Sequence, residues 1–135
     1  MSMVLDNSCA IPWVIAEESD ADALALSELV SSRGAVVPPL FFAEFANVLL
    51  KAVRRRRITS EEQQAGMEFV GNLPLETDHL EPTSSVLVYL GERYGLSGYD
   101  AWYLYLAISR GLPLATRDTA LREAAKSIGI GLVDA

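Results

Sequence analysis

Short apolar segments alternate with helical patterns from one end of the chain to the other, and this alternation constrains the fold more than any other feature. Strands separated by helices imply a parallel sheet with helices on both faces, because each crossover needs a helix to return the chain. The sequence therefore predicts a three-layer α/β/α fold around a central parallel sheet of about five strands. The predicted strands are residues 3–5, 35–37, 73–77, 112–116 and 130–134.

Helical patterns fill the intervals between these strands, and some have clear ends. A capping-box pattern, Thr59 with Glu62 or Ser60 with Gln63, marks the start of one helix. A glycine directly follows each of two later helices, as is typical of a helix end. The helical stretches are residues 8–16, 20–34, 38–57, 59–73, 82–94, 99–110 and 119–129.

The composition fits one folded domain that spans residues 1–135. Half of the residues are hydrophobic, and a chain of this length buries about two-thirds of its unfolded surface. No apolar run approaches the roughly 20 residues of a membrane span, and no signal peptide is visible. Cys9 is the only cysteine, which fits a reducing compartment. We therefore expect a cytoplasmic protein without a membrane segment.

The net charge of −7 argues against a general nucleic-acid-binding protein, because phosphate contacts require Lys and Arg. Four of the eleven basic residues nevertheless stand together at Arg54, Arg55, Arg56 and Arg57. Two interpretations of this run stay open. It is either a solvated helix end, where cations complement the partial charge of the helix C-terminus, or a track for phosphate groups.

Four acidic residues are predicted to meet at one edge of the sheet. In open parallel sheets, ligands bind beyond the carboxyl ends of the strands. Asp6 follows the first predicted strand, Glu44 lies on the helix after the second, and Asp118 follows the fourth. Asp100 opens a helix that runs back toward the start of the fourth strand, so it begins at the same edge.

Each acid also has a simpler explanation. Asp118 and Asp100 are both placed to cap helices, and Asp6 is placed to form an ordinary turn. Glu44 is harder to explain, since it interrupts a helix that is apolar on nearly every side. Glu44, Asn47 and Lys51 share one stripe of this helix, which we expect to face a cleft and not open solvent.

Several carboxylates within a few ångströms repel one another, and a divalent cation resolves that conflict. Oxygen ligands without His or Cys nearby suit Mg²⁺ or Mn²⁺ and do not suit zinc. The remaining candidates are weaker. Asp78, Asp134 and His79 are expected at the surface, and Cys9 is expected to fill space in a short helix.

Four blocks of the sequence resemble, in order, those of PIN-domain endoribonuclease toxins of the VapC type. The blocks are "VLDNSCAIPW", "PPLFFAEFANVLL", "LSGYDAWYLYLA" and "LATRDTALREAA". The likeness runs from about residue 4 to residue 134, and each block carries one acid. Neither a Gly-rich phosphate loop nor a serine-hydrolase elbow is present in the sequence.

The resemblance implies a fold, an activity and a site. The family's acidic quartet falls on Asp6, Glu44, Asp100 and Asp118, as catalytic residues and ligands of one or two Mg²⁺ or Mn²⁺ ions. A metal-activated water then hydrolyses RNA phosphodiester bonds. The family's supporting polar positions fall on Ser8, Asn47 and Thr116, with Asn47 expected to orient Glu44.

The resemblance also implies partners. They are an RNA substrate, a cognate DNA-binding antitoxin and a second copy of the chain in a homodimer. Apolar residues at 13–16 and 29–32 are candidates for the dimer surface, unless the core takes them. The alternative function is a catalytically inactive PIN-like module that serves as an RNA-binding unit or scaffold.

Overall fold

A computed structural model describes residues 2–135, and it contains one parallel four-stranded sheet. The strands lie in the order β3-β2-β1-β4, so β1 and β2 are central. Val4 pairs with Val36 of β2 on one side and with Leu114 of β4 on the other. The strands are β1 (Val4–Leu5), β2 (Ala35–Val37), β3 (Leu75–Thr77) and β4 (Leu114–Ala115).

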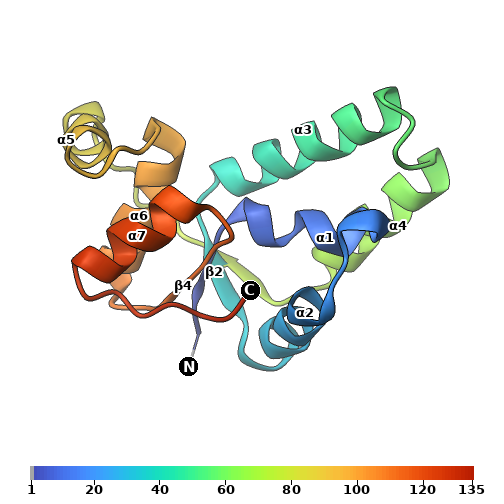
Figure 1. The fold of residues 1–135 in the computed structure, drawn as a ribbon, viewed down its shortest axis with the longest axis horizontal. Coiled ribbons are helices and arrows are strands. Elements are labelled where there is room, and N and C mark those ends of the chain that lie inside the picture. The colour runs from blue at the N-terminus through green and yellow to red at the C-terminus, as the bar shows by residue number, and fades with distance from the viewer. Residues whose placement is uncertain (1) are drawn as a thin grey trace.

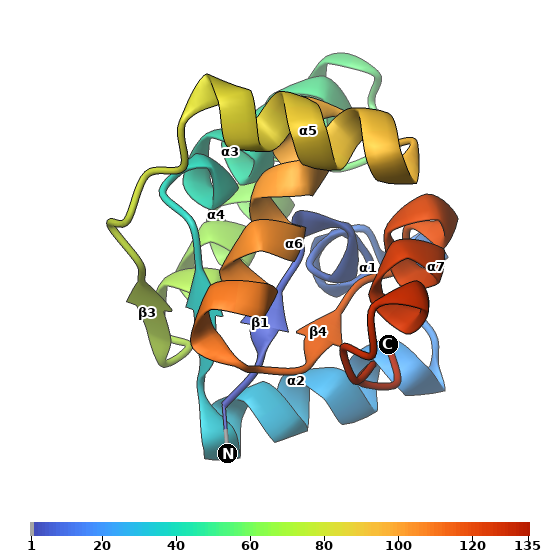
Figure 2. The same ribbon diagram turned by 90° about the vertical axis from the view of Figure 1, so that its left-hand side faces the viewer.

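Helices lie on both sides of this sheet, as predicted. In Figure 1, α5, α6 and α7 lie to one side of the strands, and α1, α2 and α4 lie to the other. Figure 2 shows α6 crossing the near face of the sheet, and α3 and α5 at the same end of the molecule. The helices are α1 (Ile11–Val14), α2 (Ala21–Arg33), α3 (Leu40–Arg54), α4 (Ser60–Gly71), α5 (Ser84–Tyr94), α6 (Gly98–Arg110) and α7 (Thr119–Ser127), with 3₁₀ turns η1 (Asn7–Cys9) and η2 (Ala16–Glu18).

The prediction of a fifth strand at 130–134 is wrong. This segment makes a single parallel bridge, between Leu132 and Leu114. Two backbone hydrogen bonds accompany it, from Leu114 N–H to the Gly131 carbonyl and from Val133 N–H to the Leu114 carbonyl. The segment therefore adds one bridge to the edge strand β4 and is not a fifth strand of the sheet.

The predicted helix at 8–16 is also divided into pieces. A 3₁₀ turn, the four-residue helix α1 and a second 3₁₀ turn replace it. Pro12 lies at the start of α1, where a missing N–H is tolerated. Because a proline at this position cannot continue a helix from the preceding turn, a new helix, α1, begins here.

The start of α4 and the ends of α5 and α6 agree with the signals predicted from the sequence. Thr59 and Glu62 form the predicted capping box at the start of α4. Gly95 and Gly111 end α5 and α6 in the left-handed conformation, with φ of 66° and 62°. These residues fix the lengths of the crossover helices.

Helix α3 differs from the prediction in an important respect. Phe41, Phe45 and Leu49 are buried, but Phe42 and Leu50 are 45% and 42% exposed. The helix is therefore amphipathic and not hidden on most faces. Its polar stripe opens to solvent at Asn47 and Lys51, and only Glu44 on the stripe is half-buried.

The core is formed by the central strands and the helices that pack on them. Every residue of β1 and β2 is buried, and α6 contributes Ala101, Tyr103, Leu104 and Ala107. Within the described part of the chain, no helix has the length and apolar character needed to cross a membrane. The buried strands bring their carboxyl ends to one edge of the sheet, where the predicted acids lie.

Candidate active site

Asp6 stands at the centre of this edge, directly after the central strand β1. Its side chain is buried, and its Oδ2 atom accepts two hydrogen bonds, from Ser8 Oγ at 2.6 Å and from Thr116 Oγ1 at 2.7 Å. Thr116 follows β4, and the pairing of Leu5 with Ala115 places the two strand ends side by side. The sheet register therefore brings together residues that are far apart in the sequence.

The two hydroxyls are themselves held by the backbone. The Arg117 N–H donates to Ser8 Oγ at 2.9 Å, and the Asp118 N–H donates to Thr116 Oγ1 at 3.1 Å. Each hydroxyl is thus oriented to donate its own proton to Asp6 Oδ2. Both hydroxyls donate to Oδ2, so neither occupies the other oxygen, Oδ1.

Asp118 caps a helix, as the simpler explanation predicts, but Asp100 does not. Asp118 caps α7, and its Oδ1 accepts from the Leu121 N–H at 2.8 Å. The cap of α6 is Ser97, whose Oγ accepts from the Asp100 N–H at 3.1 Å. Asp100 lies in the first turn of α6 with a half-buried side chain that does not act as the cap.

Glu44 is fixed by a residue that we did not predict from the sequence. The hydroxyl of Tyr103 donates a hydrogen bond of 2.6 Å to Glu44 Oε1. The predicted partner, Asn47, is exposed, and its side chain makes no hydrogen bond with the described residues. The prediction that Asn47 orients Glu44 is therefore wrong, because Asn47 lies on the solvent side of α3 while Tyr103 approaches from the core.

One feature of the sequence points weakly to the contact between Tyr103 and Glu44, namely that Tyr103 comes three residues after the site acid Asp100. Residues three apart are neighbours on a helix surface, so Tyr103 lies beside Asp100 on α6. In the sequence, however, a tyrosine within an apolar helix looks like any core aromatic residue. Only the folded structure shows that its hydroxyl reaches Glu44 of α3.

The four carboxylates influence one another electrostatically. Burial raises the pKa of Asp6, hydrogen bonds from Ser8 and Thr116 oppose this, and the charge of Asp118 adds to it. Burial also raises the pKa of Glu44 and of Asp100, and nearby acids, Asp6 foremost, raise both further. The four acids thus share one region of negative potential.

Among the described residues, no Lys or Arg forms an ion pair with any of the four acids. The ion pairs of the described residues join Arg57, Arg110 and Arg117 to other acids, and none includes a member of the quartet. Partly buried carboxylates without a basic partner are typical of sites that take up a cation from solution.

The donor atoms fit a hard divalent ion. All four side chains offer oxygen, and no His or Cys belongs to the cluster, so Mg²⁺ or Mn²⁺ is the suitable ion. Between residues 2 and 135, no three Asp, Glu, His or Cys side chains lie close enough together to hold one metal ion. Mg²⁺ keeps several water ligands and binds through only one or two carboxylates directly, so it does not require such a group.

The arginine run lies away from this cluster. Arg54 is the last residue of α3, about 15 Å along the helix axis from Glu44 at 1.5 Å per residue. Arg57 is engaged with Glu17 and Glu18, and Arg56 has a positive φ of 58°. Arg57 therefore lies beyond the helix end and pairs with acids, whereas Arg54 and Arg55 are exposed, so both interpretations stay open for these two.

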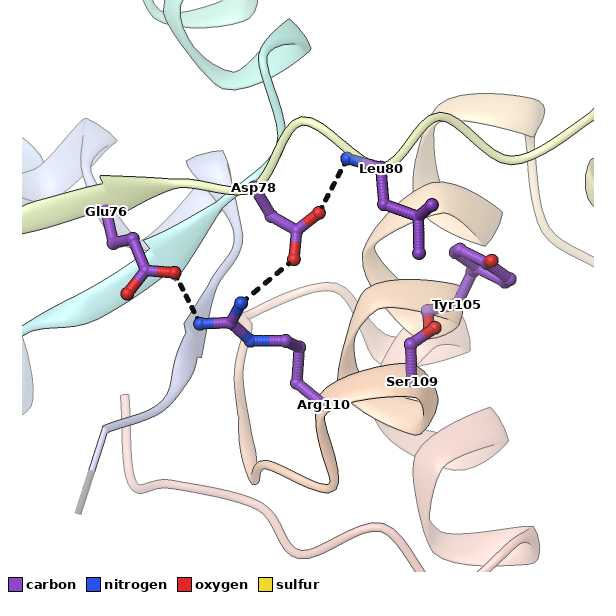
Figure 3. A network of polar contacts seen from close by, with 6 residues as sticks. All are labelled: Glu76, Asp78, Leu80, Tyr105, Ser109 and Arg110. Carbon is purple, nitrogen blue, oxygen red and sulfur yellow. Dashed lines mark hydrogen bonds and ion pairs between the residues drawn. The ribbon is translucent and has the colours of Figure 1, made fainter.

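The weaker candidates lie outside the site, although one prediction about them is wrong. Asp78 is not a free surface acid. Its carboxylate accepts from Arg110 at 3.2 Å and from the Leu80 N–H at 2.8 Å, as Figure 3 shows. Arg110, at the end of α6, also pairs with Glu76 of β3, so it ties the edge strand to this helix.

The other three residues behave as predicted. Asp134 and His79 are exposed. Cys9 is buried, and burial raises the pKa of its thiol to about 12, so it stays protonated and fills space.

Comparison with known proteins agrees with this geometry. The PIN domain family model matches residues 3–127. Two curated proteins named Ribonuclease VapC1, from two strains of Mycobacterium tuberculosis, are each 32% identical over 106 residues, which is 77% of this chain and 77% of theirs. The crystal structure of PAE2754 from Pyrobaculum aerophilum has the same fold, with a TM-score of 0.69, 22% identity, and 99% of this chain and 89% of that chain covered. The chain therefore belongs to the PIN domain family and, within it, to the VapC type.

Proposed function

We propose that this protein is a Mg²⁺- or Mn²⁺-dependent endoribonuclease and the toxin of a type II toxin–antitoxin system. One observation carries the proposal. Asp6 is held through Oδ2 by two hydroxyls, at the centre of four acids that form no ion pair with the basic side chains between residues 2 and 135. The matched relatives named as ribonucleases support the same activity.

Asp6, Glu44, Asp100 and Asp118 would hold the metal. When bound, a divalent ion polarises the scissile phosphate and increases the acidity of a water ligand. Ser8 and Thr116 keep Asp6 in one orientation, and Tyr103 does the same for Glu44. The protein thus supplies a fixed set of oxygen atoms.

The carboxylates also supply a proton acceptor. Glu44 and Asp100 are half-buried, so each remains accessible from solvent. Burial and neighbouring charges raise the pKa of both above the ordinary value. Because both reach solvent, these two are the candidates for taking the proton from the attacking water.

RNA would approach along α3. Asn47, Lys51, Arg54 and Arg55 are exposed and lead away from Glu44 toward the end of the helix. Basic side chains at that end offer phosphate contacts beside an acidic site. Arg57 is excluded from this role by its ion pairs with Glu17 and Glu18.

Protein partners would use the apolar surface of α3 and α5. The segments 13–16 and 29–32 do not supply a patch, because Val14, Ile15 and Val30 are buried in the core. Phe42 and Leu50 of α3 and Val88 and Tyr89 of α5 are exposed instead, on helices at the same end of the molecule (Figure 2). We assign the homodimer and antitoxin contacts to these helices.

The experiment that tests the function is a search for new RNA ends. Purified protein is incubated with total RNA from the host, with Mg²⁺ or with EDTA, and the 5′ ends are mapped by sequencing. We expect defined internal cleavage sites only with Mg²⁺, and none with Asp6→Asn protein. RNA that stays intact under all conditions, while binding the protein, would favour the non-catalytic RNA-binding alternative.

A further inference from the structure

The contact between Tyr103 and Glu44 joins two helices that carry acids of the site. Tyr103 lies on α6, one turn beyond Asp100, and Glu44 lies on α3. The donor–acceptor distance of 2.6 Å is typical of a hydroxyl bound to a charged carboxylate. One hydrogen bond therefore fixes the relative position of two carboxylates that come from different parts of the chain.

The tyrosine is rigid and remains a donor. Its side chain is completely buried, with 0% exposure, so the ring cannot change position without opening the core. A tyrosine hydroxyl has an ordinary pKa of about 10, so it keeps its proton and can donate at neutral pH.

The hydrogen bond uses only one oxygen of Glu44. Oε1 accepts from Tyr103, and Oε2 makes no hydrogen bond with the described residues. Asp6 shows the same arrangement, since its Oδ2 is saturated by two hydroxyls and its Oδ1 is free of them. In both acids a fixed oxygen on the core side leaves the second oxygen for a ligand.

We propose that Tyr103 is a positioning residue of the site, whose hydroxyl holds Glu44 so that Oε2 is presented to a divalent cation. This inference rests on the proposed metal-dependent function. Tyr103 does not touch the cation or the RNA. It acts through Glu44, as outer groups act on the ligands of many metal sites.

The test compares Tyr103→Phe with Tyr105→Phe. Both changes remove one hydroxyl from α6, but the Tyr105 hydroxyl makes no hydrogen bond with the described residues, so it serves as the matched control. Mn²⁺ affinity is measured from the EPR signal of free Mn²⁺, without RNA. Circular dichroism melts in EDTA verify the fold. We expect Tyr103→Phe to bind Mn²⁺ about tenfold more weakly and Tyr105→Phe to equal wild type.

A second pair of variants tests whether Tyr103 acts through Glu44. On a Glu44→Gln background, adding Tyr103→Phe should change Mn²⁺ affinity by less than about twofold, because residues that act as a unit are not additive. An equal loss on both backgrounds, or wild-type affinity in Tyr103→Phe, would overturn the inference. Wild-type protein that does not bind Mn²⁺ would instead contradict the proposed function on which the inference rests.

Discussion

Thr116 Oγ1 donates a hydrogen bond of 2.7 Å to Asp6 Oδ2 across two parallel strands, although the residues are 110 positions apart. Thr116 is completely buried, and it also accepts from the Asp118 N–H. A single hydroxyl thus connects two acids of the site. It orients the Asp6 carboxylate by donating its proton, and it orients the Asp118 backbone by accepting from the Asp118 N–H.

Thr116→Val should destabilise the protein, because valine keeps the shape but leaves Asp6 with one hydroxyl donor and the Asp118 N–H without an acceptor. Loss of a partner for a buried polar group costs about 1–3 kcal/mol. The measurement is urea denaturation in EDTA. Thr119→Val, at an exposed position of α7, should change the midpoint little. Equal midpoints for the two variants would show that the hydroxyl is not needed.

Asp100→Asn should stabilise the metal-free protein at neutral pH. Burial and the charges of Asp6 and Asp118 raise the pKa of Asp100, so its ionised form is unfavourable in the folded state. Thermal melts in EDTA should place the variant at or above wild type. Added Mg²⁺ should raise the melting temperature of wild type more than that of the variant, since a ligand stabilises the state that binds it.

The stability difference between Asp100→Asn and wild type should depend on pH with a definite sign. Because the folded-state pKa of Asp100 lies above the unfolded value of about 4, the folded protein binds the proton more tightly. The cost of ionisation is absent below about pH 4 and develops as the pH rises toward the raised pKa. The difference in melting temperature between Asp100→Asn and wild type should therefore be largest at neutral pH. A constant difference from pH 3.5 to 7.5 would contradict this explanation.

Asp118 has a capping role that its substitutions can separate from a ligand role. Asn retains an oxygen that accepts from the Leu121 N–H, while Ala does not. In EDTA, Asp118→Ala should be less stable than Asp118→Asn by about 1 kcal/mol. Both variants should lose Mg²⁺-dependent cleavage. Cleavage that persists in Asp118→Asn would mean that Asp118 is only a cap.

The exposed arginines should contribute to RNA affinity, whereas Arg57 should not. Replacing Arg54 and Arg55 together by Gln should reduce the slope of log Kd against log salt by about 1.4, at about 0.7 for each contact to single-stranded RNA. The Arg57→Gln variant is the control, because Arg57 is engaged with Glu17 and Glu18. Fluorescence anisotropy in EDTA measures both. Equal slopes for the two variants would leave Arg54 and Arg55 as an ordinary helix end.

Local sequence signals predicted much of this structure. The capping box at Thr59 and the glycines after α5 and α6 fixed helix ends that depend on nearby residues alone. The four acids follow from the order of strands and helices, since parallel strands end at one edge. Asp6, the acid after the central strand, is the one that the sheet buries most deeply.

Features that depend on side-chain packing could not be predicted. The exposure of Phe42 depends on which helices cover α3, and the burial of Tyr103 depends on where α6 crosses the sheet. Asp78 pairs with Arg110 only because β3 lies beside the end of α6. Each of these features depends on packing between segments that are far apart in the sequence, and no local sequence pattern predicts such packing.

The dependence of RNA cleavage on Mg²⁺ concentration tests the central claim most directly. The substrate is an RNA that contains a mapped cleavage site, and the variants are Asp100→Asn and Asp134→Asn, which remove a site acid and an exposed acid elsewhere. We predict a rate that saturates with Mg²⁺ for wild type and Asp134→Asn, and a loss of at least about 100-fold for Asp100→Asn. Equal cleavage by wild type in EDTA, or an Asp100→Asn rate equal to that of Asp134→Asn, would contradict a metal site built from the four acids.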